Sequence, residues 1–290
     1  MSQIIERIWR AGVSRHLTDW IPDKPYLEIT YKLRTGEKMD WKHPQSFNQK
    51  LQWMKIYDRN PRYSELVDKL KAKEIAGSIL GYDHIIPTIG VYDSFREINF
   101  NALPEAFVLK CSHDSGCTIV CKEKETFNIQ NARIRLTKAI KTDYYKYWRE
   151  YPYKDVPRKI IAEEYKDDGS GELKDYKIFC FDGEPYIIQV DFGRFSEHKR
   201  NLYDLNWQYV PVCYTYPNDK SVKIQRPTNL KQMLNMARAL SRNMKFARID
   251  FYICNDTVYF GEFTLFPEGG YGFFDDKSFE REIGKRLRVF

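Results

Sequence analysis

The sequence predicts an α+β protein with mixed, largely antiparallel sheets and a helical N-terminal region. Apolar residues recur at helical spacing through much of the first hundred residues, whereas short apolar runs of strand length dominate from residue 106 onward. Asp182-Gly183 separates two of these runs and is typical of a tight hairpin, which makes the strands on either side antiparallel. Helices and strands are thus largely segregated along the chain, as in α+β folds.

The helices are predicted from their caps and apolar stripes. Ser46 is a suitable N-cap for a helix that starts at the next residue. A second helix is expected from Ser64 to Gly81, because serine favours helix starts and glycine favours helix ends. Two further helices are predicted over residues 127–140 and 229–243. The predicted strands are 106–111, 117–121, 159–165, 175–181, 184–191, 247–253 and 258–264.

Composition limits the classes of function. The chain has 290 residues and a formal net charge of +7, which favours an anionic partner such as a nucleotide, a nucleic acid or an acidic glycan without choosing among them. No apolar run reaches the length of a bilayer span, and the first residues lack the apolar core of a signal peptide. We therefore expect a cytoplasmic protein with no integral membrane segment.

Residues 1–17 can form a basic amphipathic helix with Ile4, Ile5, Ile8 and Val13 near one side. Two interpretations stay open. The helix packs on its own domain or on a partner subunit, which would make a homo-oligomer possible, or it anchors the protein at a membrane surface.

The six cysteines do not form a recognisable metal or disulfide pattern. None is spaced C-x-x-C, and no histidine pair at zinc-finger spacing accompanies them. A reducing cytoplasm disfavours disulfides. We therefore expect the cysteines, including the three in "FVLKCSHDSGCTIVC" (residues 107–121), to act mainly as small packing residues.

Two segments have the residue types of a nucleotide site. Lys110 ends an apolar strand and is followed by "CSHDSGC", so an ammonium group and several loop amides could surround a phosphate. The alternative is a solvated lysine beside an ordinary hairpin loop. In "KIIAEEYKDDG" a strand runs directly into Glu163, Glu164 and Tyr165. Such a connection between two lobes could offer backbone groups to an adenine and a carboxylate to a ribose.

Two carboxylates in successive strands indicate a metal site. If residues 255–257 form a three-residue loop, Asp250 lies opposite Glu262 on one face of the hairpin, whereas a two-residue turn would put them on opposite faces. Arg248 shares the face of Asp250, and Thr264 shares that of Glu262. Facing carboxylates repel unless a positive charge lies between them. Mg²⁺ carrying nucleotide phosphates would supply that charge.

Taken together, these segments resemble the ATP-grasp fold and, more closely, its TupA-like branch, which is linked to teichuronopeptide and capsular polysaccharide synthesis. The resemblance extends from about "HPQSFNQKLQ" to the C-terminal helix. It rests on the ordered set "LVDKLKAKE", "IIPTIGVYDSF", "FVLKCSHDSG", "IIAEEY", "DYKIFCFDGEPYIIQVD", "HKRNLYDLNW" and "RIDFYICNDTVYFGEFTLFPEGG". It implies a helical N-terminal region over 1–105, a small lobe with the phosphate loop over 106–162, and a large lobe with the metal site over 163–290.

The resemblance also implies site residues and cofactors. ATP and Mg²⁺ are the expected cofactors. Residues expected to bind the nucleotide are Lys69, Lys110, Ser112, His113, Ser115, Gly116, Glu163, Glu164, Tyr165 and Lys177. The metal ligands would be Asp250, Glu262 and Thr264, the last standing where many ATP-grasp enzymes have asparagine. Arg194, His198, Lys199 and Arg200 would bind the acceptor, and Lys110, Arg200 and Arg248 would act on the transferring phosphoryl group.

The activity that the resemblance implies is ATP-dependent carboxylate–amine ligation. The expected partners are ATP, a uronic-acid sugar nucleotide or acidic glycan, and an amino acid, with no nucleic acid. Three other functions stay open: a glycosyltransferase of the same pathways, a sugar kinase, and a non-catalytic glycan or nucleic-acid binding protein. Salt-dependent binding that survives loss of both metal-site carboxylates would favour the last of these.

Overall fold

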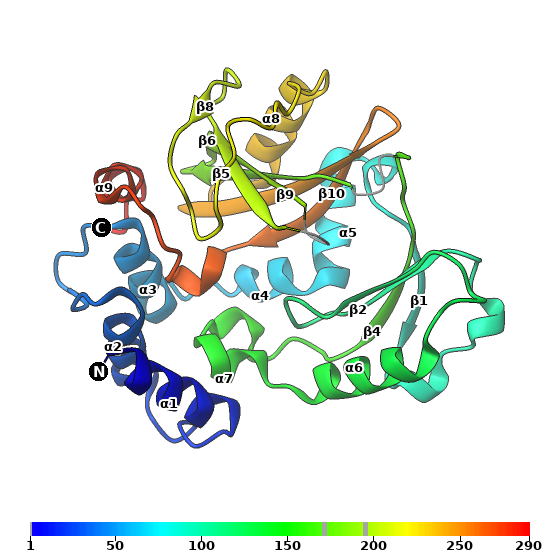
Figure 1. Cartoon of the computed structure of the whole chain (residues 1–290), viewed down its shortest axis with the longest axis horizontal. Coiled ribbons are helices and arrows are strands. Elements are labelled where there is room, and N and C mark those ends of the chain that lie inside the picture. Colours follow the sequence, from blue (N-terminus) through cyan, green and yellow to red (C-terminus); the bar gives the residue numbers. More distant parts are fainter. Residues whose placement is uncertain (1, 170–172, 194–196) are drawn as a thin grey trace.

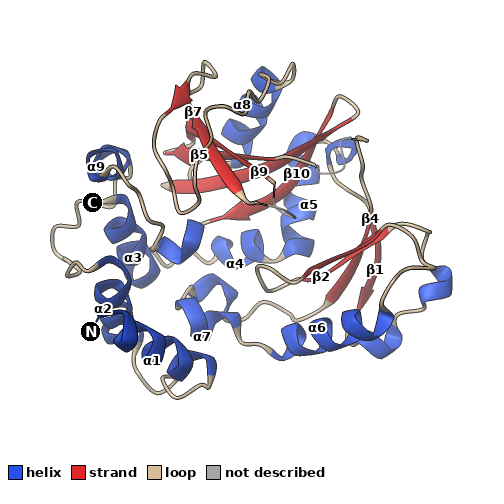
Figure 2. Cartoon of the chain, in the orientation of Figure 1, coloured by secondary structure: helices blue, strands red, loops and turns tan. Residues whose placement is uncertain are grey.

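Two antiparallel sheets organise the chain (Figures 1 and 2). The computed structural model describes residues 2–169, 173–193 and 197–290. In the four-stranded sheet the order is β1-β4-β2-β3, and in the six-stranded sheet it is β10-β9-β5-β6-β7-β8. The strands are β1 Thr88–Tyr92, β2 Phe107–Cys111, β3 Thr118–Cys121, β4 Ile160–Glu164, β5 Asp175–Phe181, β6 Glu184–Phe192, β7 Lys199–Tyr203, β8 Tyr209–Val210, β9 Phe246–Cys254 and β10 Thr257–Thr264.

Helices fill the N-terminal part and cover the sheets, so the predicted α+β class is confirmed. The helices are α1 Ser2–Ser14, α2 Asp23–Thr35, α3 Phe47–Tyr57, α4 Arg62–Val67, α5 Lys69–Leu80, α6 Ile129–Lys141, α7 Tyr144–Trp148, α8 Leu230–Leu240 and α9 Lys277–Arg286. In Figure 1, α1, α2, α3 and α9 gather at the left, the six-stranded sheet lies at the top, and the four-stranded sheet lies at the lower right.

The helix caps explain where the N-terminal helices begin and break. Ser46 accepts a hydrogen bond from the backbone N–H of Gln49, as expected for the N-cap of α3. The single helix predicted from Ser64 to Gly81 is wrong, because the chain breaks at Asp68. There the backbone is extended, and the carboxylate accepts from the N–H of Leu70, so it caps a new helix. This break separates α4 from α5.

Each sheet buries its own apolar layer. On the four-stranded sheet, Ala132 and Leu136 of α6 pack with Phe107 and Leu109 of β2, and all four are fully buried. On the six-stranded sheet, α8 packs on β5, β6 and β9, while α4 and α5 contact β10. Burying one such large apolar side chain contributes roughly 1.5–3 kcal/mol. The two sheets therefore have separate hydrophobic cores.

The first helix packs through Trp9 and Val13, whereas its isoleucines do not take part. Trp9 and Val13 contact the cluster around α2, and Trp9 donates a hydrogen bond to Thr30. Ile4 and Ile8 instead face solvent, with 63% and 67% of their surface exposed. The membrane and partner-subunit interpretations stay predictions. Among the described helices, none is long and apolar enough to cross a membrane.

Candidate functional site

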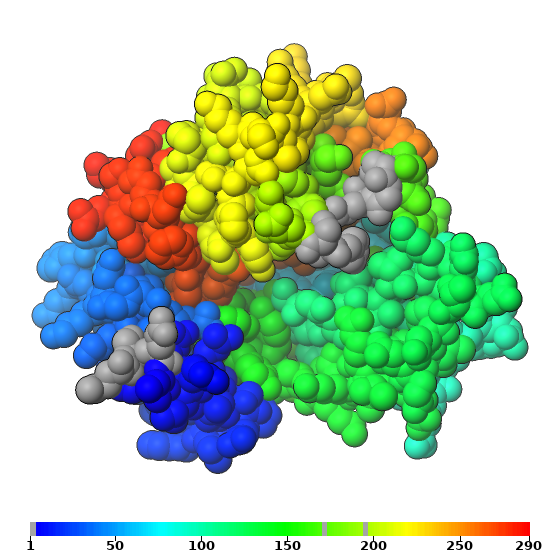
Figure 3. All heavy atoms as spheres, in the orientation of Figure 1, coloured from blue at the N-terminus to red at the C-terminus, as the bar shows by residue number. Residues whose placement is uncertain are grey.

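A cavity of about 550 Å³ separates the two sheets. Strands β2, β3 and β4 and the segment that follows β4 form one side, and the β9–β10 hairpin forms the other. In Figure 3 the surface of the region that holds β2–β4 is green and lies at the lower right, and that of the β9–β10 hairpin is orange and lies above it. Residues around the cavity include Lys73, Val108, Lys110, Lys122, Glu163, Glu164, Tyr165, Lys166, Asp175, Tyr252, Phe260 and Gly261.

A buried carboxylate with two lysines lies in the wall of this cavity. Glu163 of β4 pairs with Lys110 of β2 at 2.6 Å and with Lys73 of α5 at 2.8 Å. Burial acts to raise the pKa of the Glu163 carboxyl, but the two ammonium groups outweigh burial and leave that pKa below its ordinary value. Glu163 is therefore an anion that holds two cations at the cavity wall.

The segment predicted to bind phosphate forms the loop between β2 and β3, residues 112–117. Ser112 donates to the carbonyl of Pro157 at 2.6 Å, and the ring of His113 contacts the carbonyl of Thr142 at 3.2 Å. Both side chains are buried and tie the base of the loop to neighbouring segments. Lys69 donates a hydrogen bond to the carbonyl oxygen of Asp114 in the same loop. Ser115 and Gly116 follow toward β3.

Asp250 and Glu262 do lie opposite each other, but the predicted loop length is wrong. The hairpin has a two-residue turn, Asn255-Asp256, with both residues at positive φ, and Thr257 already pairs with Cys254. A bulge between Phe260 and Glu262 inserts Gly261 and shifts the register by one residue. With the two-residue turn alone, Asp250 and Glu262 would lie on opposite faces of the hairpin. The bulge brings them back to the same face.

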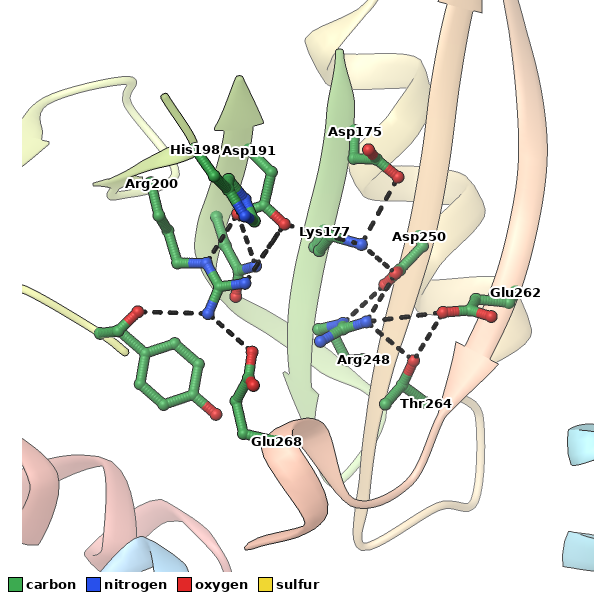
Figure 4. Close-up of polar contacts among 12 residues, drawn as sticks. Asp175, Lys177, Asp191, His198, Arg200, Arg248, Asp250, Glu262, Thr264 and Glu268 are labelled. Carbon is green, nitrogen blue, oxygen red and sulfur yellow. Dashed lines mark hydrogen bonds and ion pairs between the residues drawn. The ribbon is translucent and has the colours of Figure 1, made fainter. Parts of the chain in front are cut away.

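The two carboxylates differ in their surroundings (Figure 4). Asp250 is 1% exposed and receives two hydrogen bonds of 2.7 Å from Arg248 and one of 2.7 Å from Lys177. Burial favours a raised pKa for Asp250, but these two cations prevail and hold that pKa below its ordinary value. The side chain of Glu262 is 39% exposed and lies 3.7 Å from Arg248. Arg248 thus supplies positive charge between the carboxylates.

The donor set of this region fits Mg²⁺. Glu262 and Thr264 present a carboxylate and a hydroxyl 3.4 Å apart, and Asp250 adds a second carboxylate across the hairpin. Hard oxygen ligands of this kind, one or two of them carboxylates, are what Mg²⁺ prefers beside phosphates. Thr264 already accepts a hydrogen bond of 2.9 Å from Arg248, so Glu262 would be the more accessible oxygen donor of the set.

A second charged cluster lies on the neighbouring strands of the same sheet (Figure 4). Arg200 of β7 pairs with Asp191 of β6 at 2.6 Å and with Glu268 at 2.8 Å. His198 lies 3.6 Å from Asp191. Lys177 lies 3.9 Å from Asp191 and 2.7 Å from Asp250, so it connects the two clusters. Together they form a charged row across the six-stranded sheet.

Apart from Lys69 and the residues of the β2–β3 loop, most of the predicted site residues fall into two groups. Lys110, Glu163, Glu164 and Tyr165 line the cavity. Lys177, Arg248, Asp250, Glu262, Thr264, His198 and Arg200 belong to the charged row. Lys199 pairs with Asp219 at 2.8 Å outside that row, and Arg194 lies outside the described residues. The sequence interpretation did not include Lys73, although its position four residues after Lys69 on a helix was a usable signal.

Two sheets with a cavity between them and a carboxylate pair on one hairpin are the arrangement of an ATP-grasp protein. The model of the TupA-like ATP-grasp family matches residues 49–288. The chain therefore belongs to this family, as the sequence predicts. No curated protein matches the sequence significantly.

Among solved structures, several ligases match the chain at low sequence identity. The D-alanine–D-alanine ligase from Bacillus anthracis complexed with ATP is 16% identical, with a TM-score of 0.38, over 69% of this chain and 53% of that one. The L-amino acid ligase from Bacillus licheniformis is 13% identical, with a TM-score of 0.45, over 77% and 49%. The Helicobacter pylori D-alanine–D-alanine ligase is 13% identical, with a TM-score of 0.46, over 85% and 68%. The chain thus spans about half the length of the first two.

Proposed function

We propose that this protein is an ATP-dependent carboxylate–amine ligase that joins a uronic acid to an amino acid. The uronic acid would be carried on a sugar nucleotide such as a UDP-hexuronic acid, and the amide would enter capsular or other cell-surface polysaccharide. Membership of the TupA-like ATP-grasp family supports ATP-dependent ligation in general. The net charge of +7 suits an anionic sugar nucleotide. Because ATP is made and used in the cytoplasm, we expect the reaction there.

One observation carries the nucleotide part of this proposal. Lys73 and Lys110 come from a helix and a strand of different sequence regions, yet both contact Glu163 at the wall of the cavity between the sheets. The opposite side of the cavity is the hairpin that bears Asp250 and Glu262. A triphosphate between these walls would offer the two lysines several negative charges in place of the single charge of Glu163. This favours binding of the triphosphate by the lysines.

The chemistry would proceed in two steps. The acceptor carboxylate attacks the γ-phosphorus of ATP, which forms an acyl phosphate and breaks the bond to ADP. The amine then attacks the acyl carbon and gives up a proton to solvent, an amide bond forms, and inorganic phosphate leaves. Lys110 and Lys73 would oppose negative charge on the transferring group, and Arg248 or Arg200 would hold the acyl phosphate. Bound Mg²⁺, held by Glu262 with Asp250 and Thr264, would neutralise further phosphate charge.

The acceptor is expected at the charged row. Arg200 and His198 lie on the side of Lys177 away from Asp250 and Glu262, as Figure 4 shows. Arg200 is held by Asp191 and Glu268, so its guanidinium has a fixed position before any substrate arrives. Arg200 is 3% exposed, so an acidic sugar that approaches this row would compete with the carboxylate of Glu268 for its guanidinium.

The test is release of ADP from Mg-ATP with a panel of UDP-linked hexuronic acids, each assayed with and without pooled amino acids. We expect ADP only when both substrates are present, together with a product heavier by one amino-acid residue in the mass spectrum. ADP formed with the sugar alone, and a phosphorylated sugar as the stable product, would instead identify a kinase. Consumption of the sugar nucleotide without ATP would identify a glycosyltransferase.

A further inference from the structure

Two cysteines and an aspartate form a compact cluster in the loop between β2 and β3. The thiol sulfurs of Cys111 and Cys117 and a carboxylate oxygen of Asp114 all lie within 4.8 Å of one another. Throughout the described ranges, this is the one group of three or more such side chains close enough to share an ion. The three residues are evenly spaced in the sequence, every third position.

The hairpin register explains why the two thiols meet. The β2–β3 ladder ends with Lys110 paired to Thr118, so Cys111 and Cys117 occupy the next pair of facing positions. The five residues between them turn the chain back, with Gly116 at a φ of +109°. The cluster is sheltered, since Cys111 is 0% and Asp114 8% exposed and Cys117 is half-buried.

A positive group stands beside the cluster. The ammonium group of Lys69 lies 3.9 Å from a carboxylate oxygen of Asp114 and also donates to the carbonyl of the same residue. Two thiolates and one carboxylate carry three negative charges, and a bound divalent ion would leave one. Lys69 is placed to offset that remaining charge.

The donor set selects the kind of ion. Thiolates are soft ligands that prefer zinc-like ions over Mg²⁺ or Ca²⁺. In a tetrahedral site, bonds of about 2.3 Å from Zn²⁺ to sulfur and of about 2.0–2.2 Å to a carboxylate oxygen put neighbouring ligand atoms about 3.6–3.8 Å apart. The three ligand atoms lie within 4.8 Å of one another, so they would close by at most about 1.2 Å to reach this spacing. A disulfide would require the sulfurs at about 2.05 Å and would leave Asp114 without a part in the site.

From this geometry we propose that Cys111, Asp114 and Cys117 form a binding site for one thiophilic divalent cation of the zinc type. The two thiols release their protons to solvent when the ion binds. The site is separate from the Mg²⁺ site proposed at Glu262 and Thr264, and it does not depend on the ligase activity. Because it joins the first and last residues of the loop next to Lys110, an occupied site fixes the conformation of that loop.

The experiment is a titration of the fully reduced protein with Co²⁺, which reports thiolate and tetrahedral coordination through its absorption spectrum. We expect a thiolate-to-metal charge-transfer band and visible bands that saturate at one equivalent, with Zn²⁺ displacing Co²⁺ and Mg²⁺ in excess leaving the spectrum unchanged. Cys117→Ser should abolish the charge-transfer band at one equivalent or weaken Co²⁺ binding by about 100-fold. Cys121→Ser and Cys213→Ser, which alter cysteines outside the cluster, should leave it intact.

Folding of the variants is checked independently by circular dichroism. Cys111 is fully buried, so a Cys111→Ser variant can fail to fold. The substitutions at the half-buried Cys117 and at Asp114 then still test the proposal. Asp114→Asn should weaken Co²⁺ binding by about 10-fold or more while both sulfurs remain. Absence of a charge-transfer band in the folded wild-type protein, or a band that survives Cys117→Ser unchanged, would overturn the proposed site.

Discussion

Lys71 and Lys73 lie two positions apart on α5, but their surroundings are opposite. Lys71 is exposed and pairs with Glu74, another exposed residue of the same helix. Lys73 is largely buried at the cavity wall, where it contacts Glu163 and the hydroxyl of Thr88 at 2.8 Å each. Burial lowers the pKa of the Lys73 ammonium group. The direction in which a lysine points from the helix therefore decides whether it faces the proposed nucleotide.

This contrast gives a matched pair of variants. Lys73→Ala should weaken ATP binding by about 10- to 100-fold, since a charge-assisted hydrogen bond contributes roughly 1.5–3 kcal/mol. Lys71→Ala removes the same charge from the same helix and should leave ATP affinity unchanged. Isothermal titration calorimetry with ATP and Mg²⁺ measures both. Equal effects of the two substitutions would mean that only net charge matters and that the cavity is not the ATP site.

Glu262 provides a second prediction at the residue scale. Glu262→Gln keeps the shape of the side chain but removes the most accessible negative charge of the proposed metal site. We expect ADP formation to fall by about 100-fold or more, with an increased Mg²⁺ requirement and unchanged thermal stability. The measurement is initial rate against Mg²⁺ concentration. Glu125→Gln, in which an exposed carboxylate elsewhere is neutralised, is the control, and similar rates for both variants would contradict the metal assignment.

At the scale of elements, the β9–β10 hairpin shows how one glycine sets the site. A Cβ atom at Gly261 would lie 3.0 Å from the backbone oxygen of Asp250 and 3.0 Å from the ring of Tyr252. The bulge can therefore hold a glycine but resists a larger residue. If the bulge were lost by slippage, Glu262 would pair with Ile249 and point to the other face of the sheet.

The prediction concerns two changes at this one position. Gly261→Val should lower Mg²⁺-dependent ADP formation as strongly as Glu262→Gln, because the crowded bulge displaces Glu262. Deleting Gly261 removes the extra residue, so Glu262 directly follows Phe260 in the ladder and still lies opposite Asp250. We expect the deletion variant to retain more activity than Gly261→Val in the same ADP assay. The reverse order of activities would show that the bulge itself, and not the facing of the carboxylates, is required.

Local signals in the sequence were sufficient to predict most helices and strands. They were insufficient to predict strand register and contacts between distant residues. The cap at Ser46 and the hairpin at Asp182-Gly183 are decided by neighbours in sequence, and both are present as predicted. The break at Asp68 and the bulge at Gly261 depend on which of several allowed local conformations the tertiary packing selects. Long-range pairs are harder still, because nothing near Glu163 in the sequence indicates that Lys73 reaches it from another element.

At the scale of the whole molecule, a buried lysine joins three distant segments. Lys55 of α3 donates to the carbonyl of Trp148 at 2.8 Å and to that of Gly269 at 2.7 Å. It is fully buried, and burial lowers its pKa to about 8. Glu150, two residues after Trp148, is 4% exposed. Burial raises the pKa of the Glu150 carboxyl to about 7, although the charge of Lys55 acts in the opposite direction.

The buried Glu150 predicts how the stability of the whole chain depends on pH. Its pKa is higher in the folded protein, about 7, than the ordinary value of 4.5, so between these pH values the folded state binds more protons than the unfolded state. The free energy of unfolding should therefore fall as pH rises from about 4.5 to about 7, by on the order of 3 kcal/mol from this group.

Glu150→Gln should remove this decline, so that the variant is more stable than the wild type at pH 8. Urea unfolding followed by tryptophan fluorescence at a series of pH values measures it. Glu65→Gln, at an exposed glutamate of α4, should keep the wild-type profile, and a decline that persists in Glu150→Gln would assign the pH dependence to another group.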